Sequence, residues 1–457
     1  MKTIRIIHTN DIHSSYDELI KMAYIIKSLK TNSSILLDAG DFNDFSSFVT
    51  FGTKGYAGLK ILSNLGYDAL SIGNNEGFQR KEIIEQMGSY NLVNILSCNL
   101  FSIDGSSIQN VKPFIIKEVD GVRFLIIGIS PYYITYNHYY NCYGTDAKEP
   151  HQIIRNTIKE NKGKYDFVLL LSHLGLKTDI MLTQSINNID IIVAGHSHHN
   201  TDVLKVNNVY MHQSGVRGSH VGYIDINIEN NKIVNITGDN ILITKTTPID
   251  EESFIEYKKQ IEKANNNLQE IVAIAKEDLY FKKDEECNYT NLLCDYLKNK
   301  YECDFSILNS GITEKDILKG NVSLNDIINT CNSPLIITKV KIKGRHIIKA
   351  IEKSKDKNVC CDNRRRTGFR GAFLGKLHVS YNVKITTNGI YINEELIENQ
   401  KCYSIITVDF LTLGLGCSYF KRNKGYEFLN ETIIDVIINA LNDKKAYKYI
   451  NQKRWEC

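Results

Sequence analysis

The residues best suited to chemistry in this chain are carboxylates, imidazoles and an amide that follow short apolar runs. They offer the oxygen and nitrogen ligands that a hard or borderline divalent cation prefers. A site for two metal ions needs roughly six to eight such ligands, ideally with one carboxylate shared between the ions. The candidate ligands are Asp11, His13, Asp41, Asn74, His173, His196 and His198. The sequence therefore predicts a two-metal centre of the kind that activates water for hydrolysis.

Each candidate ligand follows a short run that is predicted to be a buried strand. The runs are residues 4–8, 35–38, 69–72, 167–172 and 189–194. Ligands bind beyond the carboxyl ends of the strands in open α/β sheets, so the five segments are expected to converge. The spacing in Asp11-x-His13 and His196-x-His198 lets two side chains point the same way. Glycines at 40, 73 and 195 allow sharp turns beside the ligands.

A single Asp-x-His or His-x-His pair is weak evidence for a metal site, because an isolated histidine is more often a hydrogen-bonded core or surface residue. Five ligand-bearing segments in succession, each behind a predicted strand, are stronger evidence. We therefore expect a metal centre from the set as a whole.

Helical spacing between the predicted strands indicates an α/β layered domain. The predicted helices are residues 19–29, 59–65, 80–87, 153–160 and 179–185. A long polar helix is expected over residues 251–276 and another over residues 289–301, and beyond residue 304 strands are expected at 335–342, 377–383 and 403–408. These patterns predict a first domain over residues 1–276, a linker helix within 277–304 and a second domain over 305–457.

Composition narrows the class of protein. The chain has 457 residues, 42% of them hydrophobic and 23% charged, and its formal net charge of +3 predicts neither a nucleic-acid nor a membrane partner. Its 11 cysteines are irregularly spaced, and residues 1–8 do not read as a signal peptide. No apolar run approaches the ~20 residues of a membrane span. We expect a cytoplasmic protein with reduced thiols; the sequence does not indicate its oligomeric state.

The order of the motifs resembles that of the calcineurin-like metallophosphoesterases. The resemblance is carried by Asp11-x-His13, Gly40-Asp41, Gly73-Asn74, His173 and Gly195-His196-x-His198. Residues 8–13 are similar to the 5′-nucleotidase/2′,3′-cyclic phosphodiesterase/UDP-sugar hydrolase branch, and residues 287–311, 373–382 and 409–416 extend the similarity. The resemblance implies a four-layer β-sandwich flanked by helices, followed by a smaller α+β C-terminal nucleotide-binding domain.

The resemblance also implies how the ligands are shared between two ions. Asp11, His13, Asp41 and His198 would hold one ion, and Asp41, Asn74, His173 and His196 the other, with Asp41 bridging. Two divalent ions would neutralise the phosphate, activate water for in-line attack and stabilise the leaving oxygen. The mixed nitrogen and oxygen ligands suggest Mn²⁺, with Zn²⁺, Fe or Mg²⁺ as alternatives.

The chain departs from the family pattern beside this centre. Family members usually continue Gly-Asn with His-Glu and then an Asp two residues further, whereas this chain, as a cytosolic branch member, has Asn75, Glu76 and Phe78. The missing His–Asp dyad normally acts near the scissile phosphate. Asn75 is the catalytic residue predicted in its place, because its amide can donate a neutral hydrogen bond.

The predicted substrate residues lie in the C-terminal domain. Phe373 and Phe410 match the two aromatic positions that would stack a nucleotide base, although either could instead be a core residue. The arginine that follows Asn-Ser in relatives is Thr313 here, and Arg370 is the predicted replacement contact for an anion. A solvated basic loop is the alternative for Arg370.

The resulting hypothesis is a metal-dependent phosphoesterase, similar to a 5′-nucleotidase, that acts on a nucleotide or a related small phosphorylated metabolite. The alternative is a catalytically weakened nucleotide-binding or regulatory protein of the same fold, which the loss of the dyad favours and the complete ligand set disfavours. A third hypothesis is hydrolysis of sulfur–sulfur bonds on a carrier protein, the chemistry of a usually periplasmic relative.

Overall fold

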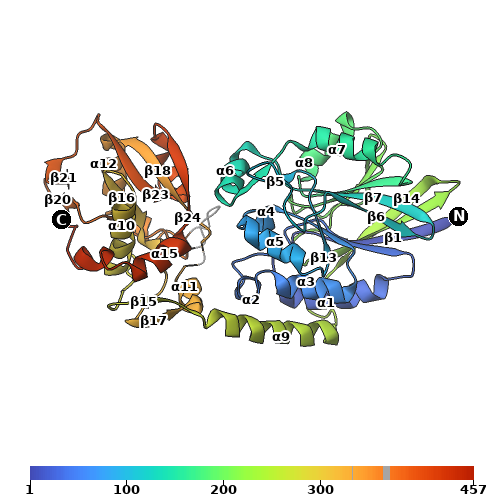
Figure 1. Ribbon diagram of the computed structural model, residues 1–457, viewed down its shortest axis with the longest axis horizontal. Coiled ribbons are helices and arrows are strands. Elements are labelled where there is room, and N and C mark those ends of the chain that lie inside the picture. The colour runs from blue at the N-terminus through green and yellow to red at the C-terminus, as the bar shows by residue number, and fades with distance from the viewer. Residues whose placement is uncertain (332, 364–370, 457) are drawn as a thin grey trace. The chain divides into compact units, whose positions relative to one another are not determined.

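The computed structural model describes residues 1–331, 333–363 and 371–456, which form two compact units (Figure 1). Unit 1 comprises Met1–Asn265 and unit 2 comprises Asn266–Cys457. Unit 1 thus ends at Asn265 rather than at the predicted residue 276. In the described part of the chain, no helix has the length and apolar character needed to cross a membrane.

Unit 1 contains two six-stranded sheets. The first has the order β14-β13-β1-β2-β3-β4 and consists of β1 (Lys2–Thr9), β2 (Ser34–Asp38), β3 (Ala69–Ser71), β4 (Asn94–Leu96), β13 (His220–Glu229) and β14 (Lys232–Leu242). The second has the order β11-β12-β10-β9-β7-β6 and consists of β6 (Phe114–Val119), β7 (Val122–Ile129), β9 (Phe167–Ser172), β10 (Ile191–Ala194), β11 (Leu204–Val206) and β12 (Val209–His212). The short strands β5 (Leu100–Ser102) and β8 (Thr145–Ala147) pair separately. All five predicted ligand-bearing strands run parallel to a neighbouring ligand-bearing strand.

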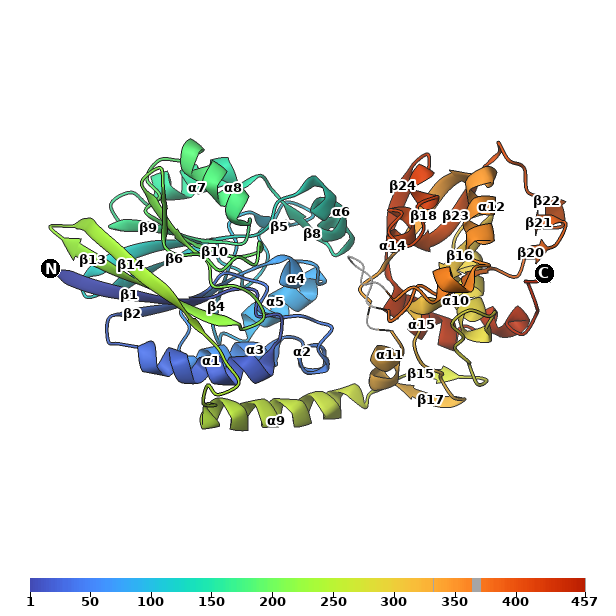
Figure 2. The same cartoon turned by 180° about the vertical axis from the view of Figure 1, so that it is seen from behind.

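Helices cover the outer face of each sheet (Figures 1 and 2). The first sheet is covered by α1 (Tyr16–Leu29), α3 (Tyr56–Leu65) and α5 (Lys81–Ser89), and the second by α7 (Pro150–Glu160) and α8 (Leu176–Ser185). Between the sheets, side chains such as Ile6 and Leu169 form a shared core. The strands β9 and β10 are buried along their whole length because both of their faces are covered. The predicted four-layer α/β architecture is confirmed.

Three short helices stand at the edge of unit 1 that carries the ligands. They are α2 (Phe48–Gly52), α4 (Asn74–Gly77) and α6 (Ile134–Cys142). The long helix α9 (Glu251–Leu268) follows the sheets, and it is shorter than the predicted 251–276. The helix ends at Leu268, and the apolar, β-branched run after it forms β15 (Ile271–Ala275), which pairs with a strand of unit 2.

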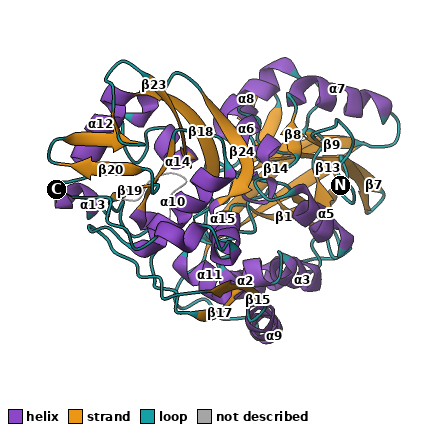
Figure 3. Cartoon of the chain, turned by 60° about the vertical axis from the view of Figure 1, so that its left-hand side comes forward, coloured by secondary structure: helices purple, strands orange, loops and turns teal. Residues whose placement is uncertain are grey.

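Unit 2 is built around a five-stranded sheet of order β19-β16-β23-β18-β24. Its strands are β16 (Phe305–Asn309), β18 (Ile336–Lys343), β19 (Leu377–Val379), β23 (Cys402–Val408) and β24 (Tyr426–Thr432). Smaller sheets are formed by β15 with β17 (Gly320–Ser323), and by β20 (Val383–Thr386), β21 (Gly389–Ile392) and β22 (Glu395–Leu396). The helices are α10 (Asn288–Lys300), α11 (Leu324–Thr330), α12 (Gly344–Lys353), α13 (Lys357–Cys360), α14 (Asp409–Thr412) and α15 (Ile433–Asn442) (Figure 3). This mixture confirms the predicted α+β class.

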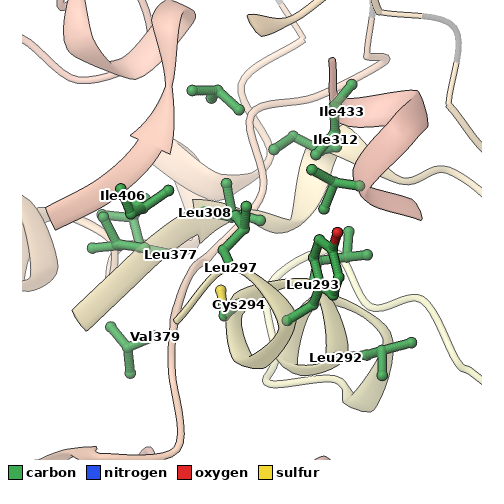
Figure 4. Packing of buried hydrophobic residues seen from close by; sticks show 14 of the residues in the cluster. Leu292, Leu293, Cys294, Leu297, Leu308, Ile312, Leu377, Val379, Ile406 and Ile433 are labelled. Atoms are coloured by element: carbon green, nitrogen blue, oxygen red, sulfur yellow. The ribbon is translucent and has the colours of Figure 1, made fainter. Parts of the chain in front are cut away.

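The helix α10 belongs to the core of unit 2. Every residue from Tyr289 to Leu297 is buried, and Leu293 and Leu297 pack in one cluster with Leu308 of β16 (Figure 4). The sequence predicts a linker helix in this region, but the structure places α10 inside the folded unit. A helix that is buried on all sides over residues 289–297 is a core element rather than a linker.

Candidate metal centre

The structure brings the predicted ligand loops together beyond the strand ends of unit 1. The amide N–H of Asp11 donates to the carbonyl of Gly40 at 2.9 Å, and that of His13 donates to the carbonyl of Asp41 at 2.9 Å. The loop after β10 joins them, because the amide of His196 donates to Asp11 Oδ2 at 2.8 Å. Hydrogen bonds donated by backbone amides therefore hold three of the loops together.

Five of the seven predicted ligands adopt a left-handed backbone conformation. Their φ angles are 51° for Asp11, 50° for His13, 52° for Asp41, 72° for His196 and 58° for His198. Non-glycine residues adopt this region infrequently, and it is common at sites where strain serves function. Each turn changes the direction of its side chain relative to the preceding strand, so the backbone conformation determines where the candidate ligands point.

All three predicted glycines are required by close approach. A Cβ at Gly73 would lie 2.2 Å from Asp41 Oδ1, and a Cβ at Gly195 would lie 2.7 Å from His173 Nδ1. A Cβ at Gly40 would lie 2.8 Å from the Gly73 nitrogen, and Gly40 also has a positive φ of 97°, which favours glycine. The absence of side chains at these positions lets the ligand loops touch one another.

A first group of ligand atoms consists of Asp11 Oδ1, His13 Nε2 and His198 Nε2. The carboxylate oxygen lies 3.3 Å from His198 Nε2 and 3.8 Å from His13 Nε2, and the two imidazole nitrogens are 3.4 Å apart. Ligands about 2.1 Å from one ion would be separated by about 3.0–3.4 Å in octahedral or tetrahedral geometry. Two of the three spacings match this range and the third, 3.8 Å, is slightly longer, so the group suits the shell around one cation.

A second group consists of Asp11, Asp41 and His173. His173 Nε2 lies 3.4 Å from Asp41 Oδ2 and 3.6 Å from Asp11 Oδ1. The two groups therefore share Asp11, whereas the resemblance implies Asp41 as the bridging ligand. Asp41 Oδ1 accepts a hydrogen bond from the backbone N–H of Asn75 at 2.7 Å, and its Oδ2 faces His173. The bridging role of Asp41 stays a prediction.

Unpaired buried atoms show that the centre fits metal ions. Among the described residues, Asp11 Oδ1, Asn74 Oδ1 and His173 Nε2 are buried without a hydrogen-bond partner. A buried polar atom left unpaired costs free energy, which a coordinated cation would recover. The ring of His196 packs edge-on against that of His173, with centroids 5.2 Å apart. All seven predicted ligands thus belong to connected loops, and their donor atoms suit divalent ions.

The electrostatics of the centre favour positive charge. Burial lowers the pKa of His173, but the carboxylates of Asp41 and Asp11 outweigh burial and raise it to about 10. Burial also lowers the pKa of His196 to about 4, with help from His173. The buried carboxylates therefore attract a cation to the second group, while His196 is neutral, as a metal ligand must be.

Supporting residues around the ligands were not singled out from the sequence. Glu76 is completely buried and accepts the amides of Asp41, Asn43 and Gly73 at 3.1, 2.7 and 3.1 Å. His173 Nδ1 lies 2.6 Å from the Ala39 carbonyl, so it donates there and leaves Nε2 for the ion. The glutamate retained in Gly-Asn-Asn-Glu was the available signal for Glu76.

The structure places Asn75 against a ligand. Its Nδ2 lies 2.6 Å from His13 Nδ1. If His13 Nε2 holds an ion, Nδ1 must carry the proton, so the carboxamide oxygen of Asn75 must face it. Asn75 is then engaged in orienting His13. Its predicted role as a donor toward the substrate stays a prediction.

An aromatic cluster fills the space beside Asn75. The Phe78 ring lies 5.0 Å from Tyr136 and 5.1 Å from Tyr140 of α6. Tyr133 stacks on His196 at 5.6 Å, and Tyr136 meets the same histidine edge-on at 6.1 Å. Burial, and then the charge of Asp41, raises the pKa of Tyr136 to about 12. The tyrosine-rich segment at 132–143 was the sequence signal for this cluster.

The predicted substrate residues have different environments in unit 2. Phe410 is only 1% exposed and belongs to the core, which agrees with the core alternative rather than with an open stacking face. Phe373 is half-buried; its ring lies 5.5 Å from Phe281, and Lys283 Nζ lies 4.8 Å from its centroid. Arg370 lies outside the described residues. Base stacking stays a prediction.

Comparison with known proteins adds independent evidence for the predicted family. The family model for calcineurin-like phosphoesterases matches residues 4–200, and the model for the 5′-nucleotidase C-terminal domain matches residues 268–422. The chain is 29% identical over 436 residues to the uncharacterized metallophosphoesterase YunD of Bacillus subtilis, covering 90% of this chain and 93% of that protein. It is 21% identical to a 5′-nucleotidase of Vibrio cholerae, covering 76% and 74% of the two chains.

Solved structures share the fold. The NAD nucleotidase NadN of Haemophilus influenzae matches with a TM-score of 0.63 and 17% identity, covering 96% of each chain. A 5′-nucleotidase from Staphylococcus aureus, solved with alpha-ketoglutarate, matches with a TM-score of 0.61 and 15% identity, covering 100% of this chain and 99% of that one. Both domains of this chain therefore have counterparts of known architecture.

Proposed function

Because the chain belongs to the calcineurin-like phosphoesterases that carry a 5′-nucleotidase C-terminal domain, we propose that it hydrolyses phosphoesters of nucleotides or of related small phosphorylated metabolites. The observation that carries the proposal is the convergence of unpaired ligand atoms, above all Asp11 Oδ1 and His173 Nε2, at one edge of unit 1. Two divalent ions bound there would neutralise the phosphate, activate a water molecule and stabilise the leaving oxygen.

The residues of the chain hold and orient this machinery. Asp11, His13 and His198 would hold one ion, and Asp41 and His173 the other, together with Asn74 and His196. Glu76 fixes the turns that present Asp41 by accepting three backbone amides. The Ala39 carbonyl and the Asn75 side chain set the tautomers of His173 and His13.

Manganese and a cytoplasmic location are the finer parts of the proposal. The mixed imidazole, carboxylate and amide ligands suit Mn²⁺, with Zn²⁺, Fe and Mg²⁺ as alternatives. The ten cysteines within the described residues form no disulfide, which supports a reducing compartment. Elemental analysis of protein purified from its own cells, and fractionation of those cells, test the two points.

The decisive experiment measures turnover with defined metal content. Protein stripped of metal and reconstituted with Mn²⁺ should bind about two ions per chain. It should then hydrolyse at least one member of a panel of aryl phosphates, nucleoside monophosphates, cyclic nucleotides, dinucleotides and nucleotide sugars. Binding of nucleotides without turnover of any ester would instead favour the regulatory alternative, which the absence of the His–Asp dyad motivates.

A further inference from the structure

The position of the missing dyad is filled by residues that do not take over its chemistry. The side chain of Asn75 faces His13, with 2.6 Å between Nδ2 and Nδ1. Phe78 stands where the aspartate would be, and its ring has no polar atom to orient a donor. The developing charge on a leaving oxygen is therefore not met by either replacement.

Tyr136 is the polar group that the aromatic cluster brings to this place. It lies on α6, and its ring packs 5.0 Å from Phe78 and 6.1 Å from His196. The residue that replaces the aspartate thus supports the tyrosine instead. A Phe at position 78 and a Tyr at position 136 are explained together by this contact.

The hydroxyl groups of the neighbouring tyrosines are already engaged. Tyr133 donates to the Leu174 carbonyl at 2.7 Å, and Tyr140 donates to the Pro131 carbonyl at 3.3 Å. The Tyr136 hydroxyl, by contrast, makes no hydrogen bond to any residue that the structure describes. Tyr136 is half-buried and its ring lies beside His196, so its unpaired hydroxyl is available to a substrate.

The geometry points to Tyr136 as the hydrogen-bond donor to the oxygen of the leaving group, in place of the His–Asp dyad. This inference rests on the proposed function. Water adds to phosphorus, the bond from phosphorus to the leaving oxygen breaks, and its electron pair stays on that oxygen. The phenol donates a hydrogen bond to that oxygen; solvent supplies the proton that completes the alcohol and accepts the proton lost by the attacking water. A phenol, with an ordinary pKa of about 10, keeps its O–H at neutral pH.

The test is Tyr136→Phe, which removes the hydroxyl and keeps the ring that packs on Phe78. Turnover of a nucleoside 5′-monophosphate or an alkyl phosphate should fall about 10- to 100-fold, since an alkoxide leaving group needs the donor. Turnover of p-nitrophenyl phosphate, which has a good leaving group, should change less than about threefold. Metal content, measured by elemental analysis, should stay that of the wild type.

Tyr140→Phe is the matched control, because Tyr140 lies on the same helix and shares the Phe78 contact. It should not alter the ratio of alkyl to aryl turnover. Equal losses on both esters in Tyr136→Phe, or no loss on the alkyl ester, would overturn the role of Tyr136. Absence of metal-dependent hydrolysis of every ester by the wild-type protein would overturn the proposed function itself, so the two failures are distinguishable.

Discussion

Asp11 is the residue on which both ligand groups depend. Its Oδ1 lies within 3.3–3.8 Å of three histidine nitrogens, while Oδ2 accepts Asn10 Nδ2 at 2.8 Å and the amide of His196 at 2.8 Å. One carboxylate therefore ties the loop after β1 to the loop after β10 and contributes a ligand atom to each group. The same side chain would therefore both bind metal and hold the two loops together.

The first prediction concerns this carboxylate. Asp11→Asn should reduce bound metal from about two ions per chain to less than one, and lower hydrolysis more than about 100-fold, because the first group loses its only carboxylate and the second loses one of two. Elemental analysis and phosphatase assays measure the two effects. Asp239→Asn, the same change on an exposed residue of β14, is the control.

A comparison with Asp41→Asn decides which carboxylate is shared. If Asp41→Asn loses both ions while Asp11→Asn retains two, the bridging role belongs to Asp41, as the family resemblance implies. If Asp11→Asn loses both and Asp41→Asn retains one, the shared ligand is Asp11.

The second prediction concerns the missing dyad. Wild-type turnover should depend more steeply on leaving-group pKa than that of relatives with His–Asp, because Asn75 faces His13 and the Tyr136 phenol would supply only a hydrogen bond, whereas a protonated histidine transfers a proton. The double change Asn75→His and Phe78→Asp should raise turnover of alkyl phosphates relative to aryl phosphates. It should also lower stability by about 1–3 kcal/mol, since Phe78 packs among tyrosines.

Rates on esters of graded leaving-group pKa, with thermal unfolding, measure both effects. Phe78→Asp alone is the control for the loss of packing. A flat dependence in the wild-type enzyme would contradict the prediction.

At the scale of elements, the loops that follow the strands carry the candidate ligands, and the sequence predicts only part of their structure. The ligands could be predicted because each follows a short apolar run, and the order of such runs is visible in one sequence. The hydrogen bond between Asn75 and His13 and the contact between Phe78 and Tyr136 could not be predicted, because they join segments whose approach is decided by tertiary packing. The same limit explains Phe410, whose burial depends on the core of unit 2.

The third prediction tests the contact between two of these loops. Gly73→Ala places a methyl group 2.2 Å from Asp41 Oδ1 and 2.3 Å from the Asp41 nitrogen, so the loop after β2 must move. We expect a loss of about 2–3 kcal/mol in unfolding free energy and weaker metal binding by about 10- to 100-fold. Denaturation curves and metal titrations measure the two losses.

Gly105→Ala is the control for the third prediction. Gly105 also has a positive φ, of 83°, but a Cβ there would meet nothing within 4 Å. This change should cost only about 1 kcal/mol and leave metal binding unaltered. Equal metal affinities in the two variants would show that the Gly73 contact does not position Asp41.

At the scale of the whole molecule, the ligands and the predicted substrate residues belong to different units. All seven ligands lie in unit 1, whereas Phe373 and Phe410 lie in unit 2. The helix α9 belongs with unit 1 over most of its length, because Tyr257 stacks on Tyr16 at 4.8 Å and Ile261 packs against the same core. The strand β15, in contrast, pairs with β17 of unit 2.

The fourth prediction follows from this division. A fragment of residues 1–268, which ends after α9 and before β15, should keep metal content and turnover of a small aryl phosphate within about tenfold, because the three apolar clusters of unit 1 are internal to it. Its preference among nucleotides should be lost. Competition assays with different nucleoside monophosphates measure this preference, and an unchanged preference would contradict the assignment of base recognition to unit 2.

The left-handed turns at five ligands also bear on how the protein melts. Each such non-glycine residue costs about 1–2 kcal/mol of folding free energy, and the binding of cations to the folded state would offset the cost of the five turns. Unit 2 contains none of the seven ligands and has its own core. Removal of metal should therefore lower the melting temperature of unit 1 alone. Calorimetry of chelated protein would resolve two transitions, and the melting temperature of the lower one would rise as ions are added. The temperature of that transition alone would therefore report how much metal unit 1 has bound.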